Sequence, residues 1–467
     1  MSIIGGILYF IFTVFYYLGK FLISLWWIYV PWFLFVLAWS LWLKYRRNKH
    51  IQSWEWVLLE VIPPRDIKQT PKVMDHFFAG LHGAHQSGLN WWEIFIQGQT
   101  QKWFSFELVS LGGEVHFYIR TVSSLRNLVE AHIYAQYPDA EIRQAADYVD
   151  SVPAQIPNEE YNLWGTEMIF TNNDNCYPIR TYPDFERDAM NEDQRVDPLS
   201  ALFEVLCKIG PGEQIWLQTL VRPGYFEWKK NCEALRDKLM ARIKRKEESL
   251  LKKEAVAWKD TTKAEAYKLA TGKTPEAKEG MNKLEEERWK SLLERHTKVE
   301  DDIIKAVEGK AGKIGFEGII RYVYLAKKEA YQSHNIQSVI GAYKVFNDQN
   351  INGLKPSAKK VSSTAIDYWW QFKKPRTAYR KRRILKEYRQ RAFVQYSPYN
   401  IIPYLKNPLF FERLPVFRWF FMKSDPLLLN TEELATIYHF PAEPVKAPLV
   451  PKIEVRRGKP PIDLPVE

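Results

Sequence analysis

The sequence predicts an α+β fold, and three observations support this prediction. An apolar segment opens the chain, two stretches of mixed strand and helix patterns follow, and a highly charged helical stretch interrupts the second of them. Strands are indicated where apolar and polar residues alternate, and helices where apolar residues recur every three or four positions. The mixed stretches predict one domain over residues 50–150 and a second over 151–372.

A hairpin is the clearest pattern of the first domain. Apolar and polar residues alternate over 104–110 and again over 115–119. Gly112 and Gly113 lie between these runs, and glycine adopts the positive φ of a tight hairpin turn without a Cβ penalty. The sequence that follows predicts a helix from Ser123 or Ser124 and a short strand over 140–145.

One strand and one helix are expected before this hairpin. Residues 54–62 are rich in strand formers, and Thr70-Pro71 places an N-cap before a proline at the first helical position. The resulting β-α-β-β-α-β order over residues 54–148 is the ferredoxin-like split βαβ order. Because that fold hosts many unrelated activities, the order does not indicate a function.

The second domain is expected to repeat this order of elements without repeating the sequence. The patterns predict strands over 161–171, 177–182, 213–221, 316–325 and 363–369, and helices from 198 and over 333–346. Residues 224–310 are dense in Lys, Glu, Arg and Ala, which predicts a long helical hairpin inserted in a second ferredoxin-like unit. This insertion is either a solvated arm or a coiled-coil arm that docks a partner.

The N-terminal segment predicts a membrane anchor over residues 1–49. Residues 21–43 form an apolar and aromatic run that, as a helix, crosses a hydrocarbon core of ~30 Å. Residues 3–18 are short for a second span, so an interfacial extension and a second span both stay open. A buried helix of a soluble protein is the third interpretation.

A basic stop sequence follows the predicted span. It consists of Lys44, Arg46, Arg47 and Lys49. The positive-inside rule then places the bulk of the chain in the cytoplasm, attached to the cytoplasmic (inner) membrane.

The formal net charge of +11 indicates acidic partners such as nucleic acid, anionic lipid or an acidic protein surface. Much of this charge lies in one predicted helix over 373–391. Its cations are Lys373, Lys374, Arg376, Arg380, Lys381, Arg382, Arg383, Lys386, Arg389 and Arg391. They bind DNA, anionic lipid or an acidic protein, or they face the protein's own acidic surface.

The basic helix opens a C-terminal region of basic and amphipathic helices over 373–440. Residues 429–440 predict a helix capped by Asn430 or Thr431, with acidic residues in its first turn. Residues 441–467 are rich in proline and predict an extended tail.

Motifs of catalysis are missing from the sequence. Gly272-Lys273-Thr274 has Tyr267 where a phosphate-binding loop needs its first glycine. The three cysteines have no metal-binding spacing, and His76, His82 and His85 lack a carboxylate partner. We therefore predict no catalytic residue, no cofactor and no metal ion.

Three segments resemble a known family. They are GEVHFYIRTVSSLRNLVEAHIYAQYPDAEI (113–142), LLNTEELATIYHFP (428–441) and KPPIDLP (459–465). Together they resemble the membrane-proximal, non-ATPase half of bacterial type IV secretion and conjugative DNA-transfer ATPases. The resemblance covers most of residues 50–467, and its first segment is the most specific.

In that family a HerA/FtsK-like motor usually follows the proline-rich strap, whereas this sequence has no Walker motif. The resemblance therefore implies a membrane-anchored, non-enzymatic scaffold, expected to be a homo-oligomer, that docks a separate hexameric P-loop ATPase. One alternative is a membrane-tethered, non-specific nucleic-acid-binding protein that uses residues 373–391. The other is a membrane-associated hydrolase with an unrecognised site.

Overall fold

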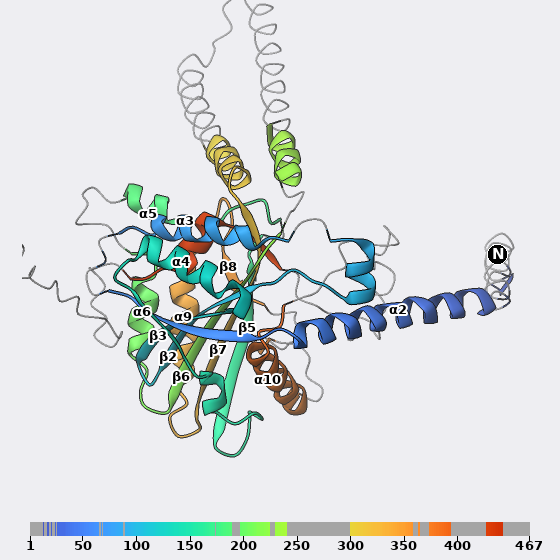
Figure 1. Ribbon diagram of the computed structural model, residues 1–467, viewed down its shortest axis with the longest axis horizontal. Helices are drawn as coiled ribbons and strands as arrows, with labels where there is room; N and C mark the ends of the chain where they lie inside the picture. Colours follow the sequence, from blue (N-terminus) through green and yellow to red (C-terminus); the bar gives the residue numbers. More distant parts are fainter. Residues whose placement is uncertain are drawn as a thin grey trace, which may run out of the picture. The chain divides into compact units, whose positions relative to one another are not determined.

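The computed structural model describes the two mixed domains and parts of the flanking regions (Figure 1). The described residues are 13, 16, 17, 20, 24, 26–64, 67, 69–86, 89–172, 174–188, 197–224, 229–240, 299–357, 363–364, 373–393 and 426–441. They form two compact units. The first contains residues 1–55 and 86–101, and the second contains residues 56–85 and 102–467.

The first unit is built on helix α2 (Trp26–Gln52) and the helical turn η2 (Glu93–Gln97). Leu43 of α2 and Phe95 of η2 share a small buried cluster, and the rings of Trp39 and Phe95 lie 5.9 Å apart. The Arg46 Nε atom donates a hydrogen bond to the Ile96 carbonyl at 2.5 Å. Gly98 has φ of +74°, and a Cβ atom there would lie 2.5 Å from the Arg46 backbone, so this contact requires glycine.

The prediction of a transmembrane helix over residues 21–43 is wrong. Among the residues that the structure describes, no helix is both long enough and apolar enough to cross a membrane. The apolar part of α2 is rich in tryptophan, which adds little hydropathy, and the helix continues through the basic residues up to Gln52. This finding also contradicts the inner-membrane localisation that was inferred from the segment. The question of a second span over 3–18 falls mostly outside the described residues.

The basic residues after the predicted span lie within α2. Lys44 and Lys49 are exposed, and Arg46 is half-buried against the η2 segment. Arg47 is buried, with 6% of its surface exposed. These four cations therefore belong to a continuous helix of the first unit.

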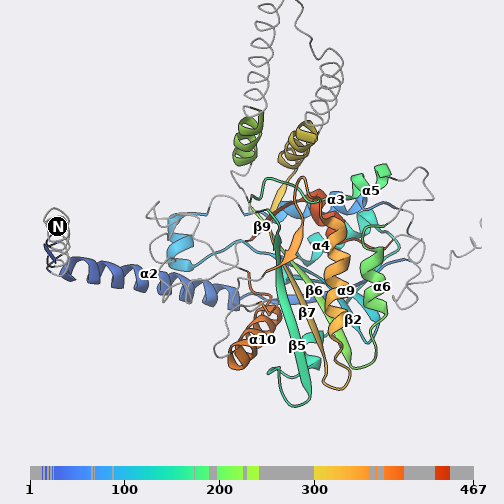
Figure 2. The ribbon, with the colours of Figure 1, turned by 180° about the vertical axis from the view of Figure 1, so that it is seen from behind.

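The second unit contains one nine-stranded sheet with the order β4-β1-β3-β2-β6-β7-β5-β8, and β9 pairs with β7 (Figure 2). Every pairing among these strands is antiparallel. The strands are β1 (Trp56–Ile62), β2 (Phe104–Leu111), β3 (Glu114–Val122), β4 (Glu141–Gln144), β5 (Tyr161–Phe170), β6 (Glu213–Pro223), β7 (Gly315–Lys327), β8 (Leu354–Pro356) and β9 (Leu427–Asn430). The expected hairpin of β2 and β3 is confirmed, with Gly112 and Gly113 both at positive φ.

The predicted fold class, an N-terminal membrane span followed by two ferredoxin-like units, is also wrong about the two units. Strands β2 and β6 pair along their lengths, from Phe104 opposite Val221 to Leu111 opposite Gln214. Pairing satisfies the backbone groups that two separate sheets would leave open at these edges. The chain therefore builds one continuous sheet, and one hydrophobic core spans both halves of it.

One face of the sheet is covered by helices (Figure 1). They include α3 (Lys72–Leu81), α4 (Arg126–Gln136), α6 (Ser200–Cys207), α9 (Ser333–Tyr343) and α12 (Thr431–Ile437). Phe106 of β2 illustrates their packing, since its ring lies 5.0 Å from Phe78 of α3 and 5.2 Å from Tyr438 just after α12. We call this side the apolar face.

The opposite side is covered by α10 (Lys373–Arg389) and the short helix η4 (Tyr148–Ser151), and we call it the polar face. Residues of one strand alternate between the two faces. In β6, for example, Leu217 belongs to the apolar cluster and Trp216 to the cluster beneath α10. This alternation follows from the period of two of a strand.

Several elements differ from the sequence predictions. The strand expected over 177–182 is absent, and α5 (Tyr182–Asp188) begins at its end. Strands β8 and β9, of three and four residues, were not predicted from the sequence. The cap of α12 is confirmed: Asn430 and Glu433 form a reciprocal capping box.

Other predictions fall outside the described residues. They concern most of the helical insertion (241–298), the Gly272-Lys273-Thr274 triplet, most of the strand at 363–369 and the proline-rich tail from 442.

Candidate functional site

The basic helix α10 lies against the polar face of the sheet. Its buried residues are Ile384, Leu385 and Tyr388, which share a cluster with Trp216 of β6. Gly165 of β5 permits this close approach, because a Cβ atom there would lie 3.0 Å from the Ile384 side chain. The helical spacing predicts an apolar seam of Tyr379, Ile384, Leu385 and Tyr388, and the last three of these are buried, whereas Tyr379 is 46% exposed.

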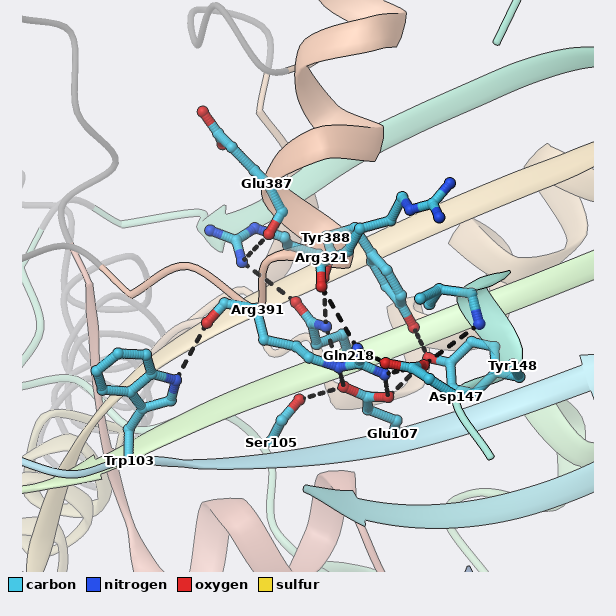
Figure 3. A network of polar contacts seen from close by, with 12 residues as sticks. Trp103, Ser105, Glu107, Asp147, Tyr148, Gln218, Arg321, Glu387, Tyr388 and Arg391 are labelled. Atoms are coloured by element: carbon cyan, nitrogen blue, oxygen red, sulfur yellow. Dashed lines mark hydrogen bonds and ion pairs between the residues drawn. The ribbon is translucent and has the colours of Figure 1, made fainter. Parts of the chain in front are cut away.

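A buried polar network lies beneath the C-terminal end of α10, and Glu107 of β2 is at its centre (Figure 3). The Glu107 carboxylate accepts hydrogen bonds from Ser105, Tyr148, Gln218 and twice from Arg391, at 2.5 to 3.1 Å. Glu107 is completely buried and Arg391 is 1% exposed. We call this set of residues, together with Asp147, Arg321 and Tyr388, the Glu107 network.

Arg391 reaches the network because of the way α10 ends. It has φ of +45°, in the left-handed region that usually favours glycine. Its N–H donates to the Tyr388 carbonyl, and the N–H of Ala392 donates to the Glu387 carbonyl, which together form a Schellman-type cap. The turn directs the guanidinium to the sheet, where it also binds Asp147 at 2.5 and 2.9 Å.

A second arginine binds the same helix end from below. Arg321 of β7 donates to the Ala392 carbonyl at 2.8 Å and to the Gln218 side chain at 3.1 Å. It also pairs with Glu167 of β5 at 3.2 Å. The network thus connects α10 with β2, β5, β6 and β7, which come from both halves of the sheet.

Charge pairing sets the ionisation of the network. Burial raises the pKa of the Glu107 carboxyl. The charge and hydrogen bonds of Arg391, together with the hydrogen bonds from Ser105 and Tyr148, outweigh this effect, so the pKa is lowered. The pKa of Asp147 is lowered by the hydrogen bond and charge of Arg391, against an opposing effect of burial. Burial raises the pKa of Tyr148 and Tyr388, so both stay neutral. This arrangement is a paired, hydrogen-bonded clamp on α10.

The structure divides the ten predicted cations of 373–391 into two groups. Six of them are half-buried or buried. Lys381 donates to Asn162 at 2.7 Å, Arg383 pairs with Glu387 at 2.9 Å, and Arg389 pairs with Asp150 at 3.0 Å. Arg391 lies in the network, and Arg376 and Arg380 are half-buried.

The remaining four cations of α10 are exposed, and we call them the cationic surface of α10. They are Lys373, Lys374, Arg382 and Lys386. The clamp holds this surface in a defined position on the sheet. It is the part of the predicted binding set that a partner can reach.

A second buried ion pair holds the ends of the helical insertion. The described ends, residues 229–240 and 299–311, are helical and lie side by side, and Arg236 faces Glu308 at 3.6 Å (Figures 1 and 2). We call these ends the arm root. Lys310 of the arm root is completely buried and pairs with Glu433 of α12 at 3.1 Å.

The sequence patterns did not predict the roles of Lys310 and Glu433. Glu433 was expected only to favour the positive end of its helix, but it also accepts a hydrogen bond from the Ile179 N–H. The neighbouring Lys313 bridges Asp75 of α3 and Glu432 of α12 at 2.7 and 2.6 Å. A lysine in a charged insertion carries no local signal that distinguishes a buried position from a solvated one.

The three neighbouring histidines do not meet at one point. His82 and His85 stack at 5.6 Å, and burial lowers the pKa of His82. Within the described ranges, no group of three or more His, Cys, Asp or Glu side chains is arranged to hold a metal ion.

Comparison with known proteins adds a family but no activity. A family model described as a domain of unknown function (DUF8128) matches residues 43–450, and the chain belongs to this family. No curated protein and no solved structure matches the chain.

Proposed function

We propose that this protein is a non-enzymatic docking scaffold that presents the cationic surface of α10 to an acidic partner. The observation that carries the proposal is the Glu107 network. It fixes α10 to four strands of the sheet while Lys373, Lys374, Arg382 and Lys386 stay exposed.

A fixed cationic surface suits docking for a physical reason. Binding is weakened by the free energy needed to order flexible groups, and a clamped helix has its backbone ordered in advance. Complementary charge also speeds association and discriminates against other cationic surfaces. The arm root, held by Lys310 and Glu433, places a second element on the same rigid sheet.

The resemblance suggests which partner docks. We propose a separate P-loop ATPase of a secretion or DNA-transfer apparatus, since the similar segments belong to proteins in which such a motor follows. The motor would supply ATP hydrolysis, and this chain would position it.

Co-purification of the full chain from its native cells tests the proposal. The test variant replaces Lys373, Lys374, Arg382 and Lys386 with Gln. The matched control replaces four exposed lysines outside α10 with Gln, namely Lys208, Lys328, Lys344 and Lys355. We expect a protein with a Walker A motif to co-purify with the wild type and the control, and at least about tenfold less with the α10 variant, because each surface ion pair contributes up to ~1 kcal/mol.

Two results would contradict the docking proposal. One is a purified complex without any P-loop protein. The other is equal recovery of the ATPase with the α10 variant and the wild type. Circular dichroism of both variants establishes that the fold is retained.

A second candidate function is non-specific binding of nucleic acid, and the same four exposed cations favour it. Phosphate contacts need only positioned Lys and Arg side chains. A gel-shift titration of the full chain at two salt concentrations tests it. With four contacts, log K should fall by about 3 for each tenfold rise in salt. Binding weaker than about 10⁻⁴ M at physiological salt would reject nucleic acid as the partner.

A further inference from the structure

Two cysteines that are distant in the sequence meet at the arm root. Cys176 lies in the segment after β5, and Cys232 lies in the helical residues 229–240. Together with Val307 they form a small buried cluster, in which Cys232 is 0% and Cys176 is 6% exposed. The cluster joins both helices of the arm root to the sheet, since Leu428 of β9 packs against it.

The two thiols belong to the same buried cluster and differ in acidity. A hydrogen bond between them raises the pKa of Cys176 and lowers the pKa of Cys232. The Lys310 ammonium group lowers the pKa of Cys232 further, while burial opposes this effect. Cys232 is thus the more acidic thiol, and the thiolate is the form of cysteine that reacts with oxidants.

The segment that carries Cys176 is held in place. The Cys176 N–H donates to the Asp174 side chain at 3.0 Å. The Tyr177 carbonyl accepts from Lys310 at 3.3 Å and from Asn352 at 3.2 Å. A covalent bond from Cys232 to this segment would therefore fix the first helix of the arm root to the sheet.

We propose that Cys176 and Cys232 are a redox modification site that forms a reversible disulfide across the arm root. The oxidant is a small peroxide. Local opening of the arm root admits hydrogen peroxide to the buried thiol. The Cys232 thiolate then attacks the O–O bond, which gives a sulfenic acid and, after proton uptake, one water. The Cys176 sulfur then attacks the Cys232 sulfur and releases the second water.

The reaction is balanced with no further reagent. Two thiols and one hydrogen peroxide give one disulfide and two waters, and the two electrons pass from the sulfurs to the peroxide oxygens. A dithiol reductant reverses the reaction by thiol–disulfide exchange. The disulfide locks the arm root, and this inference does not depend on the partner of α10.

Packing alone is the competing explanation, because buried cysteine often serves as a small apolar side chain. Cys207 of α6 provides an internal comparison, since it is half-buried and packs against the apolar core. It packs against the apolar core and does not belong to the cluster of Cys176 and Cys232. The Cys207→Ser variant therefore serves as the matched control.

The test treats the full folded chain with increasing hydrogen peroxide, then alkylates and digests it for mass spectrometry. We expect a linked Cys176–Cys232 peptide, lighter by two hydrogens than its separate parts, in the wild type and in Cys207→Ser. Dithiothreitol should abolish it. A wild type that yields this peptide only after unfolding, or at no peroxide concentration, would overturn the proposal.

Limited proteolysis measures the locking effect. Oxidised wild type should be cleaved within residues 229–240 at least about tenfold more slowly than reduced wild type, since a cross-link suppresses local opening. Cys176→Ala and Cys176→Ser should show no dependence on peroxide. Two substitutions are used because a buried hydroxyl can destabilise the cluster where alanine does not. An equal cleavage rate for oxidised and reduced wild type would refute the lock.

Discussion

The two faces of the sheet are stabilised by different interactions, although the same strands build both. Phe106 and Leu108 of β2 point into the apolar core, while Glu107 between them lies at the centre of the polar network. On the apolar face, helices cover large apolar side chains. On the polar face, α10 rests on a small apolar seam and two paired arginines.

This difference separates stability from positioning. Burial of a large apolar side chain contributes about 1.5–3 kcal/mol, and this contribution is non-directional. A buried ion pair contributes little net stability compared with an apolar replacement, but it is costly to break and holds only in one geometry. We therefore infer that the apolar face stabilises the fold and that the Glu107 network sets the position of α10.

The largest effect is expected when one partner of the network is removed. Arg391→Met should lower the free energy of unfolding by about 3–5 kcal/mol, because it leaves the buried Glu107 carboxylate without its cation. Urea unfolding at neutral pH measures this change. The double variant Glu107→Gln with Arg391→Met removes the charge and keeps one of the two acceptor oxygens that Ser105 and Tyr148 use, and it should regain at least half of the loss. A double variant as unstable as the sum of the two single ones would argue against a charge-based clamp.

A core substitution on the apolar face should have a somewhat smaller effect. Leu434 of α12 is 0% exposed, and Leu434→Ala should cost about 3 kcal/mol through lost burial and the cavity left behind. Combined with Arg391→Met, the losses should add within about 0.5 kcal/mol, as expected for sites without shared partners. A larger coupling energy in urea unfolding would show that the two faces are not independent.

Acid should weaken the polar face selectively. The pKa of Glu60 is lowered, first by its hydrogen bond to His116 at 2.8 Å and then by Arg143, against an opposing effect of burial. A lowered folded-state pKa stabilises the fold above the unfolded pKa of about 4.3, and this stability is lost as the pH falls through the folded value.

Glu60→Gln tests this dependence. It should be less stable than the wild type at pH 7, and this deficit should shrink as the pH falls below the unfolded pKa of about 4.3, because the wild-type carboxylate then becomes protonated. Leu434→Ala is the control, because its deficit should not change between the two pH values. If the deficit of Glu60→Gln stayed constant from pH 7 to pH 3, ionisation of Glu60 would not contribute to folding.

The smallest effect is expected at the exposed cations of α10. Lys386→Gln should change the free energy of unfolding by less than about 0.5 kcal/mol, since exposed substitutions away from packed features are nearly neutral. Its melting temperature should therefore equal that of the wild type within error. A marked loss of stability would place Lys386 in the clamp and remove it from the cationic surface.

Local patterns in the sequence determined many of the elements. The alternation in β2 and β3, the glycine pair between them and the capping residue Asn430 each depend on neighbours within a few positions. Most of the buried side of α10 also followed from helical spacing, since three of the four expected seam residues are buried and only Tyr379 is exposed. Such features are decided by local backbone geometry and by which side of an element is apolar, so a sequence is enough to predict them.

Only the tertiary structure decided which distant segments meet. The pairing of β2 with β6 merges the two expected units. The left-handed backbone conformation of Arg391 makes this predicted surface cation the buried partner of Glu107. Cys176 and Cys232 meet in one buried cluster. Each contact joins residues far apart in the chain, so no pattern of neighbours records it. The apolar N-terminal run shows the same limit, because its composition predicted a membrane span, whereas no described helix there is long and apolar enough to cross a membrane. Composition and spacing specify what an element can bury, and the packing of the whole chain decides what it buries against.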